Sequence, residues 1–340
     1  MKAIGFTKSL PIEDNNSLFE FDMACPEPTN HDLLVKVEGV SVNPVDLVVR
    51  QSLRKKVKQP KVIGYDAVGV VTSIGNKVDN FKIGDRIFYA GALKRAGSNS
   101  EYQLVDEHIV AKVPQELTDA EVAAMPLTSL TAYEALFEKM QLTFNVLDNK
   151  GKTILIINGA GGVGSIAIQL AHLAGLTVIA TASRPETRQW CLKLGADYVV
   201  NHRKDLCKEV QKIGFKDVDC ILELNNIDQH WNEMAEIIKP DGIICSITEN
   251  KQPIDLQKLT RKRVTFVWEW MFSKTYYHVN EASQGKILSQ IASLLANQTI
   301  KSTVTTTLAP INATNLRKAH KMVQSGHMIG KVVVVNQIEN

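Results

Sequence analysis

The chain has 340 residues, of which 44% are hydrophobic and 22% charged, an ordinary globular mixture that excludes a largely disordered protein. At about 150 residues per domain, the length predicts roughly two domains. The formal net charge is only +3, from 39 basic and 36 acidic side chains. Nucleic-acid-binding and membrane-surface proteins normally carry more basic charge and carry it clustered, so we expect neither nucleic acid nor a membrane as a partner.

Membrane insertion and secretion are also not expected. The longest apolar runs, at 154–157 and 332–335, are far shorter than the roughly 20 residues that span a bilayer. The N-terminal segment turns polar after Phe6, which does not resemble a signal peptide. Five cysteines without a C-x-x-C pair are typical of reduced thiols. Together these features predict a cytoplasmic protein.

The first 115 or so residues have the pattern of a small β-barrel. Stretches rich in β-branched residues alternate with glycine and proline at short intervals, which is typical of all-β domains. The predicted strands are 32–42, 62–74, 86–90 and 102–105.

After Thr118 the pattern changes to helices and then to a strict alternation of strands and helices. Helices are predicted at 119–124 and 131–139. The alternating strands are 153–158, 177–181, 198–200, 219–224 and 242–247, and the helices between them are 163–174, 185–194, 204–213 and 228–238. Short apolar strands separated by longer helices predict a parallel sheet covered on both faces, hence an α/β protein with a doubly wound domain.

The tail mixes strands at 264–270 and 331–335 with helices at 281–296 and 312–325. We assign it to the first domain, because the doubly wound sheet looks complete by about residue 263 and the remaining strands need a partner sheet. The predicted domains are therefore 1–124 with 265–340, and 125–264.

A glycine motif of the form G-x-G-x-x-G follows the strand that ends near residue 158 and opens a helix. Gly159 should allow a tight turn, Gly161 the approach of a pyrophosphate, and Gly164 close packing of helix on strand. The first N–H groups of the helix, at Gly162 and Val163, would face the phosphates. This context predicts a dinucleotide site.

The end of the following strand favours NADP over NAD. An NAD site needs a carboxylate about 20 residues after the motif, yet no Asp or Glu precedes Glu186. Ser183 and Arg184 suit a 2′-phosphate instead. Further candidates near that phosphate are Arg188, His202 and Arg203. The alternative is that these arginines only form exposed helix starts and surface.

Two motifs resemble the medium-chain dehydrogenase/reductase superfamily over essentially the whole chain. Residues 64–71 (GYDAVGVV), with Gly75, Val78, Phe81 and 84–86 after them, resemble its GroES-like barrel. Residues 158–171 resemble the quinone oxidoreductase, or zeta-crystallin, branch. Within it, 228–230, 268–272 and 329–331 are similar to a bacterial subgroup labelled zinc-type alcohol dehydrogenase-like. The resemblance implies a GroES-like catalytic domain and a Rossmann NADP-binding domain.

The residues of this chain do not match the zinc site that the subgroup label implies. Zinc-using relatives have a Cys where this chain has Asn43, a His where it has Tyr65 and a Cys near Leu127. A catalytic zinc needs three Cys, His or carboxylate ligands, so we expect no zinc. No Cys lies between Cys25 and Cys191, which also excludes the four-cysteine structural site. The scattered histidines have no metal-binding spacing and are interpreted as ordinary residues.

Without zinc, hydride from NADPH should pass to acceptors that are already electrophilic, namely quinones and α,β-unsaturated carbonyls. The candidates for hydrogen-bond donors to the acceptor are Asn43 and Tyr65. Alternatively, Tyr65 only packs in the barrel and Asn43 only forms a turn before Pro44. Asp46 is expected either to orient Asn43, to cap the next helix or to contact substrate.

The resemblance assigns five more residues to the cofactor. Thr131, Leu224 and Asn225 correspond to positions that meet the nicotinamide ribose and ring. Gly330 and Lys331 correspond to the loop near the carboxamide.

A concentration of aromatic side chains between residues 268 and 277 has two interpretations. Trp268, Trp270 and Phe272 could form the wall of a pocket for flat apolar carbonyl substrates. Alternatively, the segment could be the interface of a homodimer, since an edge strand at 264–270 could extend a sheet into a second copy.

Two other functions stay open at this point. One is a zinc-dependent alcohol dehydrogenase whose metal ligands are not recognised. The other is a non-catalytic NADPH-binding sensor or interaction protein.

Overall fold

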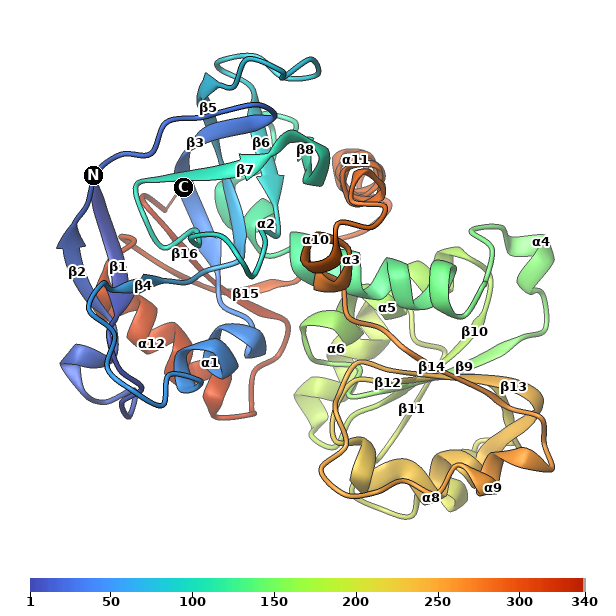
Figure 1. Ribbon diagram of the computed structural model, residues 1–340. Coiled ribbons are helices and arrows are strands. Elements are labelled where there is room, and N and C mark those ends of the chain that lie inside the picture. The colour runs from blue at the N-terminus through green and yellow to red at the C-terminus, as the bar shows by residue number, and fades with distance from the viewer. Residues whose placement is uncertain (339–340) are drawn as a thin grey trace. The chain divides into compact units, whose positions relative to one another are not determined.

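The structure is a computed structural model that describes residues 1–338 (Figure 1). The chain divides into two compact units. The barrel unit comprises Met1–Leu130 and Phe272–Asn340, and the Rossmann unit comprises Thr131–Met271. Both boundaries lie a few residues later in the chain than predicted, and the first falls within the helix α3 (Pro126–Tyr133). Across residues 1–338 no helix is long and apolar enough to cross a membrane.

The barrel unit is built on a seven-stranded sheet with the order β15-β16-β3-β5-β6-β8, and β7 pairs with β3 off this path. These strands are β3 (Asp32–Ser41), β5 (Asp66–Ile74), β6 (Arg86–Tyr89), β7 (Tyr102–Asp106), β8 (Val110–Lys112), β15 (Val304–Leu308) and β16 (Lys331–Val335). A second sheet has the order β2-β1-β4, from β1 (Lys2–Phe6), β2 (Phe19–Asp22) and β4 (Lys61–Val62). The predicted β-rich first domain is confirmed, whereas β1, β2 and β15 were not predicted.

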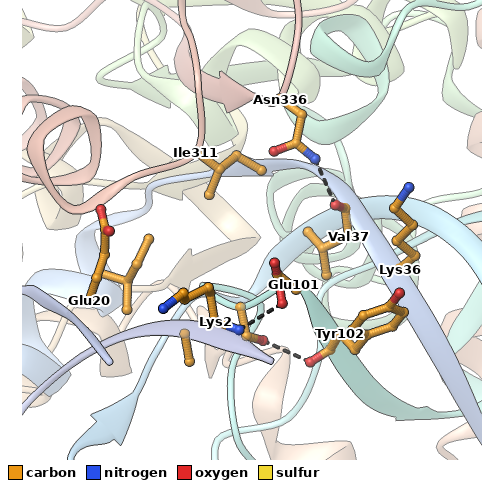
Figure 2. Close-up of a pocket in the computed structure, with 11 residues that line it drawn as sticks. Lys2, Glu20, Lys36, Val37, Glu101, Tyr102, Ile311 and Asn336 are labelled. Atoms are coloured by element: carbon orange, nitrogen blue, oxygen red, sulfur yellow. Dashed lines mark hydrogen bonds between the residues drawn. The ribbon is translucent and has the colours of Figure 1, made fainter. Parts of the chain in front are cut away.

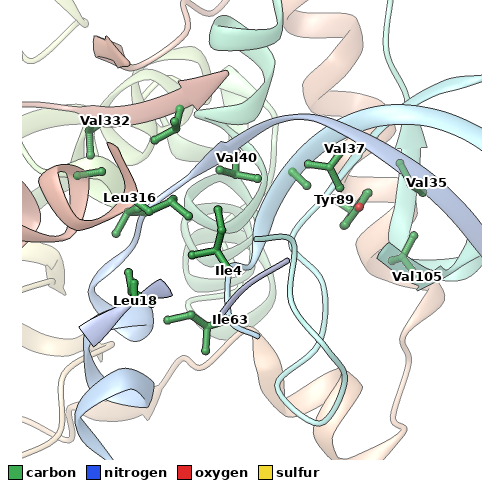
Figure 3. Close-up of a cluster of buried hydrophobic side chains, with 14 of the residues drawn as sticks. Ile4, Leu18, Val35, Val37, Val40, Ile63, Tyr89, Val105, Leu316 and Val332 are labelled. Carbon is green, nitrogen blue, oxygen red and sulfur yellow. The ribbon is translucent and has the colours of Figure 1, made fainter. Parts of the chain in front are cut away.

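Residues far apart in sequence share the core of the barrel unit. Figure 3 shows three of the buried aliphatic side chains of this core: Val40 of β3, Leu316 of the helix α12 (Ala313–Gln324) and Val332 of β16. β16 pairs antiparallel with β3, which joins the end of the chain to its first long strand. The helices of this unit are α1 (Pro44–Gln51), α2 (Asp119–Ala123), α10 (Phe272–Tyr277), α11 (Ala282–Ala296) and α12 (Ala313–Gln324), with 3₁₀ turns η1 (Asn15–Ser17) and η2 (Glu107–Ile109).

The Rossmann unit contains one parallel sheet with the order β11-β10-β9-β12-β13-β14. Its strands are β9 (Thr153–Ile157), β10 (Thr177–Thr181), β11 (Tyr198–Val200), β12 (Val218–Glu223), β13 (Ile238–Ser246) and β14 (Thr265–Trp268). Its helices are α4 (Val146–Asn149), α5 (Gly162–Leu173), α6 (Pro185–Lys193), α7 (Leu206–Lys212), α8 (Ile227–Ile237) and α9 (Gln257–Thr260). α5 and α8 lie on opposite faces of the sheet (Figure 1), as a doubly wound fold requires.

The assignment of residues 265–271 to the barrel domain was wrong. β14 pairs in parallel with β13, with Thr265 opposite Ile243, and forms the sixth strand of the Rossmann sheet. The predicted sheet ended too early because a loop and the short helix α9 follow β13. The sequence pattern does not indicate that the chain then returns to pair with the free edge of β13. β14 is an edge strand, as expected.

The predicted helix at 131–139 also differs from the structure. α3 begins at Pro126, where proline is well accommodated in the first turn of a helix. From Glu134 to Lys139 the helix continues with π geometry. The predicted start at Thr131 therefore lies five residues too late.

Candidate functional site

The glycine loop of the Rossmann unit joins β9 to α5. Asn158, directly after the strand, has the left-handed φ of 65°, and Gly161 is the N-cap residue of α5. The tight turn was assigned to Gly159, but the residue with left-handed backbone is Asn158. Asparagine tolerates this conformation better than most residues, so the loop does not require a glycine there.

Two glycines of the loop are needed for packing. A Cβ atom at Gly164 would lie 2.5 Å from the Asn158 carbonyl oxygen, and one at Gly159 would lie 2.9 Å from the Ala180 Cβ. A Cβ at Gly161 would meet only the movable Asn158 side-chain amide at 3.0 Å. Packing within the unit therefore explains Gly159 and Gly164, whereas approach of a ligand explains Gly161 better.

The first turn of α5 offers donors to an anion. Gly162 and Val163 are the first two residues of this 12-residue helix, where backbone N–H groups have no carbonyl partner inside the helix. Such N–H groups and the positive end of the helix dipole favour a bound phosphate. This arrangement fits the pyrophosphate of a dinucleotide.

The end of β10 brings His202 to the glycine loop. The Thr181 hydroxyl accepts a hydrogen bond from the Asn158 backbone N–H at 2.9 Å and lies 3.0 Å from His202 Nδ1. Burial, together with the charges of His230 and Arg203, lowers the pKa of His202. The imidazole is therefore neutral at physiological pH and adds a hydrogen-bonding group rather than a charge.

The predicted phosphate-binding cations differ in exposure. Arg184 is partly exposed at the start of α6, and its Nε lies 3.2 Å from a carboxylate oxygen of Glu186. Arg188 is half-buried in the same helix, whereas Arg203 is exposed. Ser183, also half-buried, lies directly before Arg184. A 2′-phosphate would compete with Glu186 for the Arg184 guanidinium, and this competition can be tested.

Asn225 and Leu224 follow the end of β12. The Asn225 backbone N–H donates to the buried Glu223 carboxylate at 2.6 Å, and Ser246 Oγ donates to the same carboxylate at 2.7 Å. Burial raises the pKa of Glu223. Leu224 is buried beside it, and Thr131 is buried in α3. Their predicted role at the nicotinamide stays a prediction.

A buried polar cluster in the barrel unit consists of Asn43, Asp46, Asp66 and Lys331, all at most 4% exposed. Asp66 begins β5 and accepts from the Asn43 side-chain amide at 2.7 Å and from Lys331 Nζ at 3.0 Å. Lys331 also donates to the Asn43 side-chain oxygen. The Leu127 backbone N–H donates to the second Asp66 oxygen at 2.7 Å. Asp66 is therefore the centre of the cluster.

Asn43 is the N-cap residue of α1, but its side chain turns into the cluster. Asp46 instead accepts a hydrogen bond from the Asn43 backbone N–H at 2.8 Å, so it holds Asn43 in place. Burial, with a further contribution from Asp66, raises the Asp46 pKa from 3.8 to about 7. Asp46 thus changes its charge near neutral pH.

Lys331 was predicted to lie near the nicotinamide. In the structure its ammonium group donates hydrogen bonds within the polar cluster. Its ammonium contacts Val42 O, Asn43 and Asp66, and the side chain is only 4% exposed. Gly330 places it there: its φ is 55°, and a Cβ would lie 2.2 Å from the Thr303 carbonyl oxygen. A role for either residue in cofactor binding stays a prediction.

Tyr65 lies next to the polar cluster and packs on Phe272. The two rings meet edge to face at 5.1 Å, and each residue is 2% exposed. Burial and the nearby Asp46 raise the Tyr65 pKa, so its hydroxyl stays protonated and can donate a hydrogen bond. Trp268 and Trp270 belong to the Rossmann unit, and each is 44% exposed. The structure therefore groups Phe272 with Tyr65.

A pocket of about 270 Å³ in the barrel unit shares no residue with the polar cluster (Figure 2). Its lining includes Lys2, Glu20, Lys36, Glu101 and Asn336. Several of these side chains already have partners: Glu101 accepts from the Lys2 backbone N–H at 2.7 Å, and the Lys2 ammonium pairs with Asp22. We do not assign the predicted site to this pocket.

Comparisons with known proteins match both units. Residues 29–115 match the model of an alcohol dehydrogenase GroES-like domain, and residues 162–284 match that of a zinc-binding dehydrogenase. A zinc-type alcohol dehydrogenase-like protein of Staphylococcus epidermidis is 42% identical over 335 residues, 98% of this chain and 99% of that protein. The chain belongs to the medium-chain dehydrogenase/reductase superfamily.

Other members of this superfamily are similar along most of the chain. Quinone oxidoreductase of Lama guanicoe is 34% identical over 238 residues, 69% of each chain. A crystal structure of a Rhizobium etli CFN 42 protein named for zinc-dependent alcohol dehydrogenases has a TM-score of 0.94 at 43% identity, covering 100% of this chain and 99% of that one. Escherichia coli quinone oxidoreductase complexed with NADPH shares the fold, with a TM-score of 0.83 at 23% identity, covering 98% and 100%. The chain is an oxidoreductase of the medium-chain superfamily.

Several of these names mention zinc, yet the polar cluster of this medium-chain oxidoreductase does not fit a catalytic zinc. Asn43, Tyr65 and Leu127 supply an amide, a phenol and an aliphatic group where zinc needs thiolate, imidazole or carboxylate ligands. The Asp66 oxygens already accept from Leu127, Asn43 and Lys331. The Lys331 ammonium supplies the positive charge that balances the carboxylates.

Sequence reasoning missed the central residue of this cluster. Asp66 belongs to the motif of residues 64–71, but a single carboxylate beside Tyr65 gave no reason to choose it. One signal was available: Lys331 opens a strand whose other four residues are valines. An ionisable side chain on such a buried strand requires a partner of opposite charge.

Proposed function

We propose that this protein is an NADPH-dependent reductase that transfers hydride to quinones or α,β-unsaturated carbonyls without a catalytic zinc. NADPH, bound to the Rossmann unit, supplies the hydride. The acceptor gains that hydride at one carbon and negative charge at its carbonyl oxygen, and a proton from water completes the reduced product. The protein has to hold the acceptor and stabilise the oxygen that becomes charged.

The observation that carries the proposal is the composition of the buried polar cluster. Asp66 and Lys331 form an ion pair that Asn43 bridges, and Asp46 fixes the Asn43 backbone. These contacts hold the Asn43 amide against Asp66, the residue that follows Tyr65. The Tyr65 hydroxyl stays protonated because its pKa is raised. In the proposal, Asn43 and Tyr65 donate hydrogen bonds to the acceptor oxygen, a task that needs no Lewis acid when the acceptor is already electrophilic.

Two features support NADPH as the reductant. No carboxylate lies between the glycine loop and Glu186, so the ribose 2′-hydroxyl of NAD lacks its usual acceptor. Ser183 and Arg184 lie two and three residues after the end of β10, where a hydroxyl and a guanidinium suit a 2′-phosphate. The E. coli quinone oxidoreductase that shares this fold was crystallised with NADPH.

We also propose a homodimer that forms through the free edge of β14. β14 is the edge strand of the Rossmann sheet; the half-exposed Trp268 is its last residue, and the half-exposed Trp270 follows two residues later. Pairing of two such edges would satisfy backbone groups and cover both indoles. Sedimentation equilibrium should give twice the chain mass, and Trp268→Glu should shift the assembly to the monomer. A monomeric wild type would refute this part.

The experiment that tests the function measures oxidation of NADPH by an ortho-quinone and by an enone, before and after treatment with a chelator. We expect turnover of both acceptors, unchanged by the chelator, and little oxidation of simple alcohols with NADP. Activity that the chelator abolishes and that zinc restores would refute a zinc-independent reaction. Tight NADPH binding without turnover of any acceptor in a broad panel would indicate the sensor alternative.

A further inference from the structure

A second group of chemically reactive side chains lies in the barrel unit, apart from the polar cluster. His31, Glu107 and His108 each place one nitrogen or oxygen so that the three atoms lie within 4.8 Å of one another. We call this group the histidine cluster. Among residues 1–338 it is the one group of three or more His, Cys, Asp or Glu side chains with such spacing. It shares no residue with the polar cluster.

The fold fixes the carboxylate of this cluster. β3 and β7 pair antiparallel with Asp32 opposite Asp106, and the Glu107 backbone N–H donates to the His31 carbonyl at 2.9 Å. The buried Glu107 side chain accepts at Oε2 from the backbone N–H groups of Asp79 at 3.3 Å and Asn80 at 3.1 Å. Its other oxygen, Oε1, lies 2.7 Å from His31 Nδ1. One carboxylate oxygen is thus anchored while the other faces the imidazoles.

His108 is oriented by a second carboxylate. Its Nδ1 lies 2.7 Å from Asp106 Oδ1, which also accepts the His108 backbone N–H at 2.9 Å. When Nδ1 donates to Asp106, the lone pair of Nε2 is left for another ligand. A carboxylate that holds the far nitrogen of an imidazole is the usual outer partner of a metal-binding histidine.

The support beneath the histidine cluster is rigid and its outer side is open. Gly285 of α11 lies so close to η2 that a Cβ would come within 2.6 Å of the His108 carbonyl oxygen. The side chains of His31 and His108 are 37% and 41% exposed, and their rings meet edge to face at 4.9 Å. An ion could therefore reach both imidazoles from solvent.

We propose that His31, Glu107 and His108 bind one divalent transition-metal ion, with Zn²⁺ as the best match. Two imidazoles and one carboxylate form a typical zinc ligand set, with water in the fourth position. At metal–ligand distances near 2.0 Å, tetrahedral ligand atoms lie roughly 3.3 Å apart. The ion would replace the hydrogen bond between His31 and Glu107, whose atoms need to separate only slightly.

The ion would act as a clamp in the barrel unit rather than in hydride transfer. It ties the residue before β3 to the turn after β7, and Glu107 connects both to the segment at Asp79 and Asn80. A ligand that binds only the folded chain raises its stability. Zinc in purified protein would therefore not by itself indicate a catalytic zinc.

The same region provides a matched control. His278 and Glu281 form a similar pair, with Nδ1 and Oε1 2.7 Å apart, but they belong to no group of three ligands among residues 1–338. His278 has a φ of 57°, a conformation that asparagine tolerates. His278→Asn thus removes a histidine–glutamate pair without touching the proposed site.

The experiment titrates Zn²⁺ into chelator-treated full-length protein by calorimetry and follows thermal unfolding with and without zinc. We expect one Zn²⁺ per chain and a higher unfolding temperature with zinc. His31→Gln and His108→Gln should each weaken binding at least roughly tenfold, and Asp106→Asn, which keeps an oxygen acceptor, about tenfold. His278→Asn should bind like the wild type. Glu107 is left intact because its buried carboxylate also accepts hydrogen bonds from the Asp79 and Asn80 backbone.

The outcomes are decisive in both directions. Loss of binding in His31→Gln or His108→Gln, with unchanged unfolding in the absence of zinc, supports the site. A wild type that binds no zinc, or binding that these variants leave unchanged, overturns it. In zinc-soaked crystals an anomalous peak between the three side chains supports the site, and a peak only elsewhere overturns it. NADPH oxidation by His108→Gln should equal that of the wild type below its unfolding temperature.

Discussion

The glycine loop of the Rossmann unit and the polar cluster of the barrel unit are built in opposite ways. The loop is a contiguous stretch in which backbone shape and missing side chains form the proposed binding surface. The polar cluster joins residues near 43, 66 and 331 through side-chain charge and hydrogen bonds. The loop can be recognised from local sequence, whereas the cluster exists only after β16 has paired with β3.

This difference has an energetic consequence. A side chain added in the loop lowers the free energy of unfolding through steric overlap, and the size of this loss depends on which atom is nearest. A side chain removed from the polar cluster leaves a buried charge without its partner, which costs far more than the pair itself contributes. The following predictions test the contrast, beginning with the largest expected effect.

Removal of the buried cation should have the largest effect. Lys331→Met leaves the Asp66 carboxylate without its cation in a buried site, and we expect a loss of about 3–5 kcal/mol in the free energy of unfolding. Urea denaturation measures it. Adding Asp66→Asn should recover part of the loss, because no charge is then stranded. Lys2→Met, which breaks the exposed pair with Asp22, should cause no measurable change. An effect of Lys331→Met as small as that of Lys2→Met would refute the buried ion pair.

The second test uses pH. Asp46 has its pKa raised from 3.8 to about 7 in the folded protein, so the folded state binds this proton more tightly than the unfolded state. The contribution of Asp46 to stability is therefore present below about pH 4 and is lost as the pH rises to about 7. At about 1.4 kcal/mol per pKa unit, a shift of about three units corresponds to on the order of 4 kcal/mol.

The Asp46→Asn variant should lack this dependence, since an asparagine oxygen can still accept the Asn43 backbone N–H. Urea denaturation at several pH values between about 4 and 8 should show that the variant gains stability relative to the wild type as the pH rises. Parallel curves for the two proteins would contradict the raised pKa.

The glycines of the loop provide the third test. Gly164→Ala forces a methyl group against the Asn158 carbonyl at 2.5 Å, and we expect a loss of about 1–3 kcal/mol in the free energy of unfolding. Gly161→Ser meets only a movable amide and keeps a good N-cap, so stability should change by less than about 0.5 kcal/mol. Binding of NADPH, followed by calorimetry, should nevertheless weaken in both. If Gly161→Ser bound NADPH like the wild type, the loop would not hold the pyrophosphate.

Some strands could be predicted for the same reason as the glycine loop, because the signal lies in a few contiguous residues. β10, β11 and β16 have the bounds that their apolar runs predicted, because each run is short and ends at polar or glycine residues. β14 was placed in the wrong unit, since nothing in its residues identifies the strand beside it. Asp66 as the centre of the polar cluster, and the grouping of His31 with His108, depend on strand register and could not be found by spacing along the chain.

The smallest effect concerns the choice between NADPH and NADH. If Arg184 pairs with the 2′-phosphate, loss of a charge-assisted hydrogen bond in Arg184→Ala should raise the Kd for NADPH roughly tenfold and leave that for NADH nearly unchanged. Glu186→Gln removes the competing carboxylate at 3.2 Å and should tighten NADPH binding. Lys193→Ala, an exposed charge at the other end of α6, is the matched control and should alter neither constant. Equal losses for both dinucleotides in Arg184→Ala would remove this residue from the phosphate site and leave the polarity of the β10 end as the only source of selectivity.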